Sequence, residues 1–282
     1  MLRKKIALLA TVAAVIGCTP LLAGRADAQS QPQRINGLID ILASGGNALS
    51  AEDWTFIDFE HSPYILSNLE TRLADLAKTR NAKGQLTSTP LVRIPVEGHE
   101  DPGVAVKQVL DSGAYGIVFP HIESKAEAER AVKSMRYPPQ EGAKYPTPRG
   151  VRGFGPGRAA KFWGITTKEY LERADVWPLN PNGELFAMLM IESEEGVKHA
   201  DEIMSVPGVA AVFIGPSDLG LSYGVGLGGP DQPAPKAEAA VATVAKACKA
   251  HKVVCAYSYV YGKGEYQKRL DQGFRMHLGG GK

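Results

Sequence analysis

The strongest constraint on the fold is an uninterrupted apolar run, residues 185–191, that ends at the carboxylate of Glu192. Such a run is typical of a strand that is buried on both faces, as in a parallel sheet covered by helices. A second apolar run, residues 209–214, is followed closely by Asp218. An ionised carboxylate at the edge of an apolar core needs a compensating partner, and two carboxylates can share a hard divalent cation. The alternative is that both acids are helix caps or loop residues.

From residue 35 onward the chain alternates strand and helix signals, which predicts βα units around a parallel sheet. Helix starts are marked by capping boxes at Ser124 and Thr166, and by an N-cap at Asp101 that is followed by proline. The length of 282 residues fits one α/β domain, a TIM (β/α)₈ barrel. Seven strands are clear, at 54–58, 90–95, 115–120, 185–191, 209–214, 253–257 and 274–278, and an eighth must come from residues around 47–49.

The N-terminus has the features of an export signal. Basic residues at positions 3–5 precede an apolar run at 6–17, and an A-x-A cleavage site ends at Ala28. We therefore expect a signal peptide at 1–28, a barrel domain at 29–282, and a periplasmic or secreted protein. The alternative is a lipoprotein anchored through Cys18, which ends a lipobox-like sequence. The apolar run is too short to span a bilayer, so no membrane span is expected.

Charge and cysteine content narrow the classes of partner. Removing residues 1–28 takes away four basic residues and one acidic residue, so the formal charge changes from +2 to −1. That balance argues against nucleic acid as a partner. Cys248 lies late in a helical pattern and Cys255 lies in the next strand. We expect two buried free thiols here, although an oxidising periplasm would allow a disulfide.

Polar residues follow the predicted strands one after another. In a (β/α)₈ barrel the carboxyl ends of all strands meet at one face, where these barrels place their active sites. Taken singly, each residue could be a turn, a cap, a structural ion pair or a packed rim histidine. Their shared position instead predicts an active site, made by Asp58 and His61 after the first strand, Arg93 in the second, His121 after the third, and then Glu192 and Asp218.

Seven motifs, in this order, resemble the HpcH/HpaI family of metal-dependent pyruvate aldolases, which is related to citrate lyase β subunits. The resemblance covers roughly residues 35–278. The motifs are Asp58-Phe59-Glu60-His61-Ser62-Pro63, Pro90-Leu91-Val92-Arg93, Leu110-Asp111-Ser112-Gly113-Ala114, Arg136-Tyr137-Pro138-Pro139, Arg152-Gly153, Ile191-Glu192 and Phe213-Ile214-Gly215-Pro216-Ser217-Asp218-Leu219.

The resemblance implies a lyase that makes or breaks a carbon–carbon bond of a 2-oxo acid through a pyruvate enolate. Substrates of the 4-hydroxy-2-oxoheptanedioate or 2-dehydro-3-deoxyglucarate type, with an aldehyde partner, are implied. Each motif then takes a role. Glu192 and Asp218 hold Mg²⁺ or Mn²⁺, with Co²⁺ as a further candidate; Arg93 stabilises the enolate oxygen; His61 is the acid/base, oriented by Asp58; Gly215, Ser217 and His121 contact the substrate.

Three departures from the family pattern are visible. Met190 stands where the family usually has glutamine, the first βα unit is shortened, and no last helix follows residue 278. We therefore expect a homo-oligomer smaller than the family's hexamer. Two alternative functions remain: a citrate-lyase-like enzyme acting on an acyl-CoA, and a degenerate barrel that binds oxo acids without turnover.

Overall fold

The computed structural model describes residues 33–226, 234–258 and 262–279. The predicted signal peptide and Cys18 lie outside these residues. The chain from Pro32 to Lys282 forms one compact unit. Within the described part, no helix is both long and apolar enough to cross a membrane.

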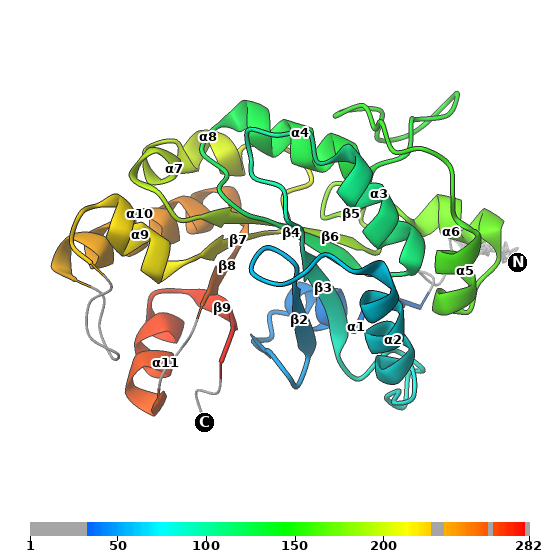
Figure 1. Ribbon diagram of the computed structural model, residues 1–282, viewed down its shortest axis with the longest axis horizontal. Helices are drawn as coiled ribbons and strands as arrows, with labels where there is room; N and C mark the ends of the chain where they lie inside the picture. Colours follow the sequence, from blue (N-terminus) through cyan, green and yellow to red (C-terminus); the bar gives the residue numbers. More distant parts are fainter. Residues whose placement is uncertain (1–32, 227–233, 259–261, 280–282) are drawn as a thin grey trace, which may run out of the picture. The chain divides into compact units, whose positions relative to one another are not determined.

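Eight parallel strands form the predicted barrel, in the order β1-β9-β8-β7-β6-β4-β3-β2 (Figure 1). A ninth strand, β5, pairs only with β6 and was not predicted. The strands are β1 Ala48–Leu49, β2 Trp54–Asp58, β3 Thr89–Arg93, β4 Gly116–Phe119, β5 Val176–Trp177, β6 Leu185–Ile191, β7 Ala211–Ile214, β8 Val254–Tyr257 and β9 Phe274–His277.

The barrel is nearly closed at the seam between β1 and β2, where a single bridge pairs Ser50 with Trp54. Ser50 can also be matched to β2 the other way round the barrel, by carrying the register of each strand pair on to the next. This route leads to position 62, beyond the end of β2, whereas the bridge leads to position 54. The two routes differ by eight residues, which is the stagger of a TIM barrel. The short strand predicted at 47–49 is therefore confirmed as the eighth strand.

A tight turn at residues 50–53 replaces the first barrel helix. Ala51 adopts a positive φ of 64° there, and the Asp53 carboxylate accepts a hydrogen bond from the Leu49 amide at 2.9 Å. The shortened first βα unit is thus present, and among the described residues no helix follows β9.

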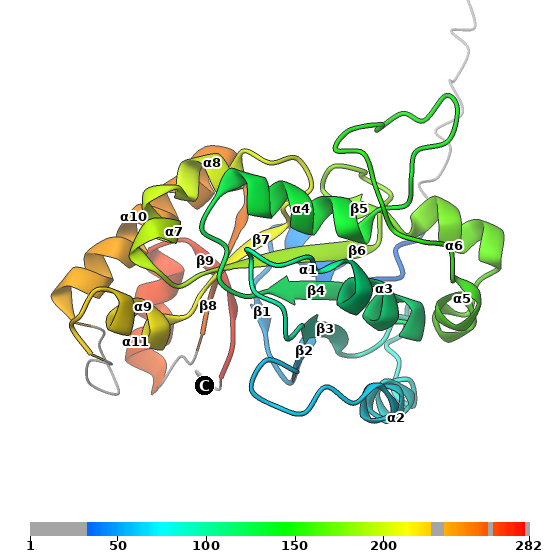
Figure 2. The ribbon, with the colours of Figure 1, turned by 45° about the horizontal axis from the view of Figure 1, so that its top comes forward.

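Most helices pack around the outside of the strands (Figures 1 and 2), whereas apolar residues of the first helix, Gly37–Ala43, belong to the cluster inside the barrel. Both predicted capping boxes form, at Ser124 and Thr166. The helix expected to start at Pro102 begins one residue later, because Pro102 is its N-cap. The helices are α1 Gly37–Ala43, α2 Leu66–Leu76, α3 Gly103–Ser112, α4 Lys125–Met135, α5 Gly157–Trp163, α6 Thr167–Arg173, α7 Glu194–Lys198, α8 Ala200–Met204, α9 Pro216–Ser222, α10 Pro235–His251 and α11 Gly262–Asp271.

Strand alternation determines which side chains reach the active face. Trp54, Leu91 and Met188 belong to an apolar cluster inside the barrel, and apolar residues of α1 belong to the same cluster. A second cluster, between strands and helices, holds the intervening residues such as Val92 and Leu189. Because side chains of a strand alternate in direction, Asp58, Arg93 and Glu192 continue the inward-facing rows at the C-terminal rim.

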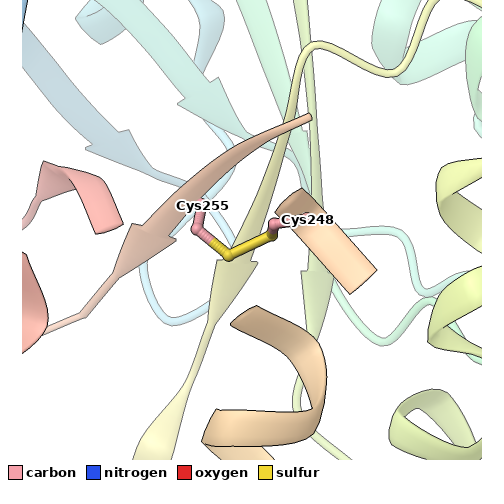
Figure 3. The surroundings of a disulfide bond; sticks show 2 residues. All are labelled: Cys248 and Cys255. Carbon is pink, nitrogen blue, oxygen red and sulfur yellow. A yellow bond between two sulfur atoms is a disulfide. The ribbon is translucent and has the colours of Figure 1, made fainter. Parts of the chain in front are cut away.

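The prediction of two free thiols was wrong, because Cys248 and Cys255 form a disulfide (Figure 3). The helix α10 ends at His251. Its C-cap, Lys252, has a positive φ of 57° that reverses the chain, and the Val253 amide donates back to the Cys248 carbonyl at 3.0 Å. This reversal brings the two Cα atoms to 5.8 Å, a separation that a disulfide spans.

We predict that the barrel opens most easily at the β1/β2 seam. One bridge holds that seam, whereas four registered pairs join β6 to β7. Amide hydrogen exchange should be fastest in residues 43–53, on the β1 side of this seam, and slowest in β6 and β7, because local opening concentrates where packing is thinnest. Equal protection of the seam and the central strands would contradict this expectation.

Candidate active site at the C-terminal end of the barrel

Arg93, at the end of β3, is the central side chain of this face. It is only 6% exposed, and its guanidinium is fixed along two edges. Nε and Nη2 donate to the two oxygens of Asp58 at 2.9 and 2.6 Å, and Nη1 lies 2.5 Å from Oε2 of Glu60. Its Cζ lies 5.2 Å from the centre of the Phe56 ring. Burial alone would lower the pKa of Arg93, but the bonds to Asp58 and the charge of Glu60 outweigh it and raise the pKa.

Asp58 binds Arg93, and the orientation of the His61 ring by Asp58 stays a prediction. Besides its two bonds to Arg93, Asp58 accepts a hydrogen bond from the Glu60 amide at 3.0 Å. Burial favours the neutral form of Asp58, but its bonds to Arg93 outweigh burial, so its pKa is lowered. The carboxylate beside the His61 ring belongs to Glu60, 3.5 Å from Nε2.

Glu60 is a site residue that the sequence analysis missed. Its side chain is 13% exposed and lies among Arg93, His61 and His121. Burial raises the pKa of Glu60, but the bond to His121 and the charges of Arg93 and the two histidines outweigh burial. The net effect is a lowered pKa. The signal that could have found it is the alternation that includes Phe56 and Asp58, which points position 60 toward the same face.

His121 joins Glu60 to Glu192. Its backbone, at a φ of 50°, directs the amide to Oε1 of Glu192 at 2.9 Å, and the ring lies 3.4 Å from Glu60 and 3.7 Å from Glu192. Gly98 makes room for this turn, since a Cβ there would approach the His121 carbonyl oxygen to 2.3 Å. The bond to Glu60 is the main cause that raises the pKa of His121 to about 9, with the Glu192 charge adding to it against burial. His121 is therefore cationic at neutral pH.

Glu192 is the most deeply buried carboxylate of the face, at 2% exposure. Burial raises its pKa to about 7; the charges of Glu60 and Asp218 act in the same direction, while His121 opposes them. Asp218, partly exposed in the first turn of α9, is thus near enough for its charge to act on Glu192. Gly215 leaves space for the Glu192 carboxylate, since a Cβ there would lie 2.5 Å from its Oε2.

The donor set suits a hard divalent cation. Glu192 and Asp218 offer carboxylate oxygens, and Mg²⁺ or Mn²⁺ is commonly bound by one or two carboxylates with water and substrate oxygens completing its shell. Within the described ranges no group of three or more His, Cys, Asp or Glu is arranged to hold a metal. The raised pKa shows that the negative charge of Glu192 is poorly compensated in the metal-free protein. A bound cation would supply the compensating charge that the proton otherwise supplies.

The structure thus brings most of the predicted site residues to one face. Met190 lies there too, with its sulfur 3.8 Å from Nη1 of Arg93, where a polar side chain would compete for the guanidinium. His61 lies at the edge with 67% of its side chain exposed, and Ser217 is exposed in the first turn of α9. The predicted residues that lie close together at the centre are Asp58, Arg93, His121, Glu192, Gly215 and Asp218.

Parallel α/β barrels place their active sites at the C-terminal face, where this chain has its acids and the fixed Arg93. The fold and site are therefore those of a (β/α)₈-barrel enzyme. Comparison with known proteins makes this specific: a sequence model of the HpcH/HpaI aldolase/citrate lyase family matches residues 44–280. The chain belongs to this family.

Two curated relatives are each 35% identical. They are a hydroxypyruvate/pyruvate aldolase from Roseovarius nubinhibens, matched over 67% of this chain and 63% of the relative, and a 5-keto-4-deoxy-D-glucarate aldolase from Escherichia coli O139:H28, matched over 62% and 58%. The chain therefore spans less than two thirds of the length of either relative.

Two solved structures are also similar. An HpcH/HpaI aldolase/citrate lyase family protein from Burkholderia cenocepacia is 31% identical with a TM-score of 0.66, covering 81% of this chain and 79% of that protein. An HpcH/HpaI aldolase from Desulfitobacterium hafniense has a TM-score of 0.68 at 23% identity, covering 86% and 89%, and shows the shared fold.

We predict that Glu192→Ala and Asp218→Ala each weaken Mn²⁺ binding by at least about tenfold without unfolding the barrel, because each removes a carboxylate ligand at the rim. Calorimetric titration with Mn²⁺ measures the affinity, and circular dichroism checks the fold. The matched control is Asp201→Ala, which removes an exposed acid paired with His251 on the outer helices. Unchanged Mn²⁺ affinity in both rim variants would show that the two acids are structural.

Mn²⁺ binding should also depend on pH. Because the pKa of Glu192 is raised to about 7, this carboxyl carries a proton below that pH in the metal-free protein. The cation must displace the proton, so affinity should fall about tenfold for each pH unit below 7 and level off above it. Calorimetry at pH 5.5 to 8 in buffers of different ionisation enthalpy would count the released proton. An affinity that is constant from pH 5.5 to 7 would contradict this assignment.

Proposed function

We propose that this protein is a divalent-metal-dependent aldolase, a lyase that cleaves or forms a carbon–carbon bond next to the carbonyl group of a pyruvate unit. The observation that carries the proposal is the fixed guanidinium of Arg93 at the same rim as the Glu192 and Asp218 carboxylates. The names of the two curated relatives support a 2-oxo acid substrate of the hydroxypyruvate/pyruvate or 5-keto-4-deoxy-glucarate type. Mg²⁺ and Mn²⁺ are the preferred candidates for the metal, followed by Co²⁺.

A divalent ion, when bound, would supply positive charge beside the carboxylate and keto oxygens of the 2-oxo acid. Arg93 would donate an N–H to the oxygen on which enolate charge develops. Because Asp58 and Glu60 already fix the guanidinium, little reorganisation is needed as that charge appears, which is the condition for effective electrostatic stabilisation. The Gly215 and Ser217 backbone at the start of α9, together with His121, would contact the substrate carboxylate.

His61 would move the proton of the acceptor hydroxyl. In cleavage its imidazole takes the hydroxyl proton, the carbonyl of the departing aldehyde forms, and the electrons of the broken carbon–carbon bond pass to the pyruvate unit as its enolate. In the addition direction the same proton returns to the new hydroxyl. The exposed position of the ring suits this role, since the acceptor must enter from solvent.

We also propose that the protein is exported through the signal at residues 1–28. The disulfide between Cys248 and Cys255 supports this, because disulfides persist mainly in oxidising compartments. Export also favours the aldolase over an acyl-CoA lyase, since coenzyme A is an intracellular metabolite.

Purified protein lacking residues 1–28 should release pyruvate from 5-keto-4-deoxy-D-glucarate or decarboxylate oxaloacetate with Mn²⁺, and a chelator should abolish both activities. His61→Ala should lower retro-aldol turnover by about 100-fold. Arg93→Lys keeps the charge but cannot contact Asp58 and Glu60 together, so turnover should fall by at least about tenfold. A coupled assay for pyruvate measures all three.

The matched controls are His251→Ala and Arg158→Lys, an outer histidine and an exposed arginine paired with Glu70. Pyruvate release that survives complete removal of metal would refute the metal-dependent mechanism. Wild-type turnover in Arg93→Lys would show that Arg93 supplies only bulk charge.

A further inference from the structure

We infer that Glu60 is a positioning residue that holds the guanidinium of Arg93 and the ring of His61 in one working arrangement. This inference rests on the proposed aldolase function and extends it to a residue outside the predicted set. Glu60 follows β2 directly, and its carboxylate lies between side chains from the ends of three neighbouring strands.

The two oxygens of Glu60 face different partners. Oε2 lies 2.5 Å from Nη1 of Arg93 and 3.5 Å from Nε2 of His61. Oε1 lies 3.4 Å from Nε2 of His121. A single carboxylate therefore contacts the proposed enolate-stabilising group, the proposed proton-transfer group and the histidine that bonds to Glu192.

Asp58 cannot perform the same task. It binds the Nε–Nη2 edge of Arg93, on the side away from Nη1, and its other contacts are with the backbone at Glu60 and His61. The ring of His61 therefore has Glu60 as its neighbouring carboxylate. Asp58 fixes the guanidinium on β3, and Glu60 couples that guanidinium to the ring.

Among the described residues, loss of the Glu60 carboxylate would leave Nη1 of Arg93 with the weak acceptor sulfur of Met190, 3.8 Å away. The guanidinium would then be free to turn from the enolate oxygen toward other acceptors. Stabilisation of the enolate should suffer more than binding of the ground-state 2-oxo acid, so kcat should fall while KM changes little.

The test compares Glu60→Gln, Glu60→Ala and wild type on the Mn²⁺-loaded protein. Glutamine keeps the reach to Nη1 but loses the charge, so kcat should fall about tenfold; alanine removes both, so kcat should fall about 100-fold. KM should stay within about threefold. Inhibition by oxalate, a planar mimic of the pyruvate enolate, should weaken in parallel with kcat, while inhibition by pyruvate and the affinity for Mn²⁺ should change less than about twofold.

The matched control is Glu129→Gln, which removes an ion-paired glutamate on α4, 3.0 Å from Lys133, and should leave every value unchanged. Values of kcat and oxalate inhibition within twofold of wild type in both Glu60 variants would overturn the inference. An equal loss of oxalate, pyruvate and Mn²⁺ binding with a lowered unfolding temperature would also overturn it, because it would indicate a merely structural role. If wild type itself neither turned over nor bound oxalate, the proposed function would fail first, and this role with it.

Discussion

The candidate site depends on the compensation of one buried cation. A guanidinium that is 6% exposed would be strongly unfavourable without partners, because removing one partner of a buried ion pair costs about 3–5 kcal/mol. Asp58 and Glu60 supply that compensation from the end of β2, which is the strand next to β3. The pairing of these two strands therefore determines where the arginine points.

The need to compensate buried charges also explains how the side chains beyond Arg93 are arranged. Glu60 also contacts His121, and the cationic His121 contacts Glu192, so charges of alternating sign extend across the rim from β2 to β6. The series ends at Glu192, where the nearby charge of Asp218 acts against that of His121. Burial and mutual repulsion raise the pKa of Glu192 to about 7, which is the electrostatic condition under which a divalent cation is an effective partner.

The sequence predicted the barrel and the rim because uninterrupted apolar runs mark strands that are buried on both faces, and because polar residues follow those runs. The strands at 54–58 and 185–191 were predicted with their observed bounds, and the improvised first strand at 48–49 was confirmed. Glu60 was missed because, although the alternation through Phe56 and Asp58 points it toward the rim, its role depends on contacts with Arg93 and His121, which lie at the ends of two other strands. The disulfide was missed because it depends on a chain reversal at Lys252, a residue type that rarely adopts a positive φ. The bonds from Arg93 to Asp58 were not predicted for a similar reason, since proximity in sequence suggested His61 whereas the paired strand supplied Arg93.

The most direct test of this account is an anomalous-scattering crystal structure of the protein soaked with Mn²⁺ and oxalate. The account predicts one strong manganese peak between the carboxylates of Glu192 and Asp218, with an oxalate oxygen within hydrogen-bonding distance of the Arg93 guanidinium. A manganese peak elsewhere, or oxalate bound out of reach of Arg93, would contradict it.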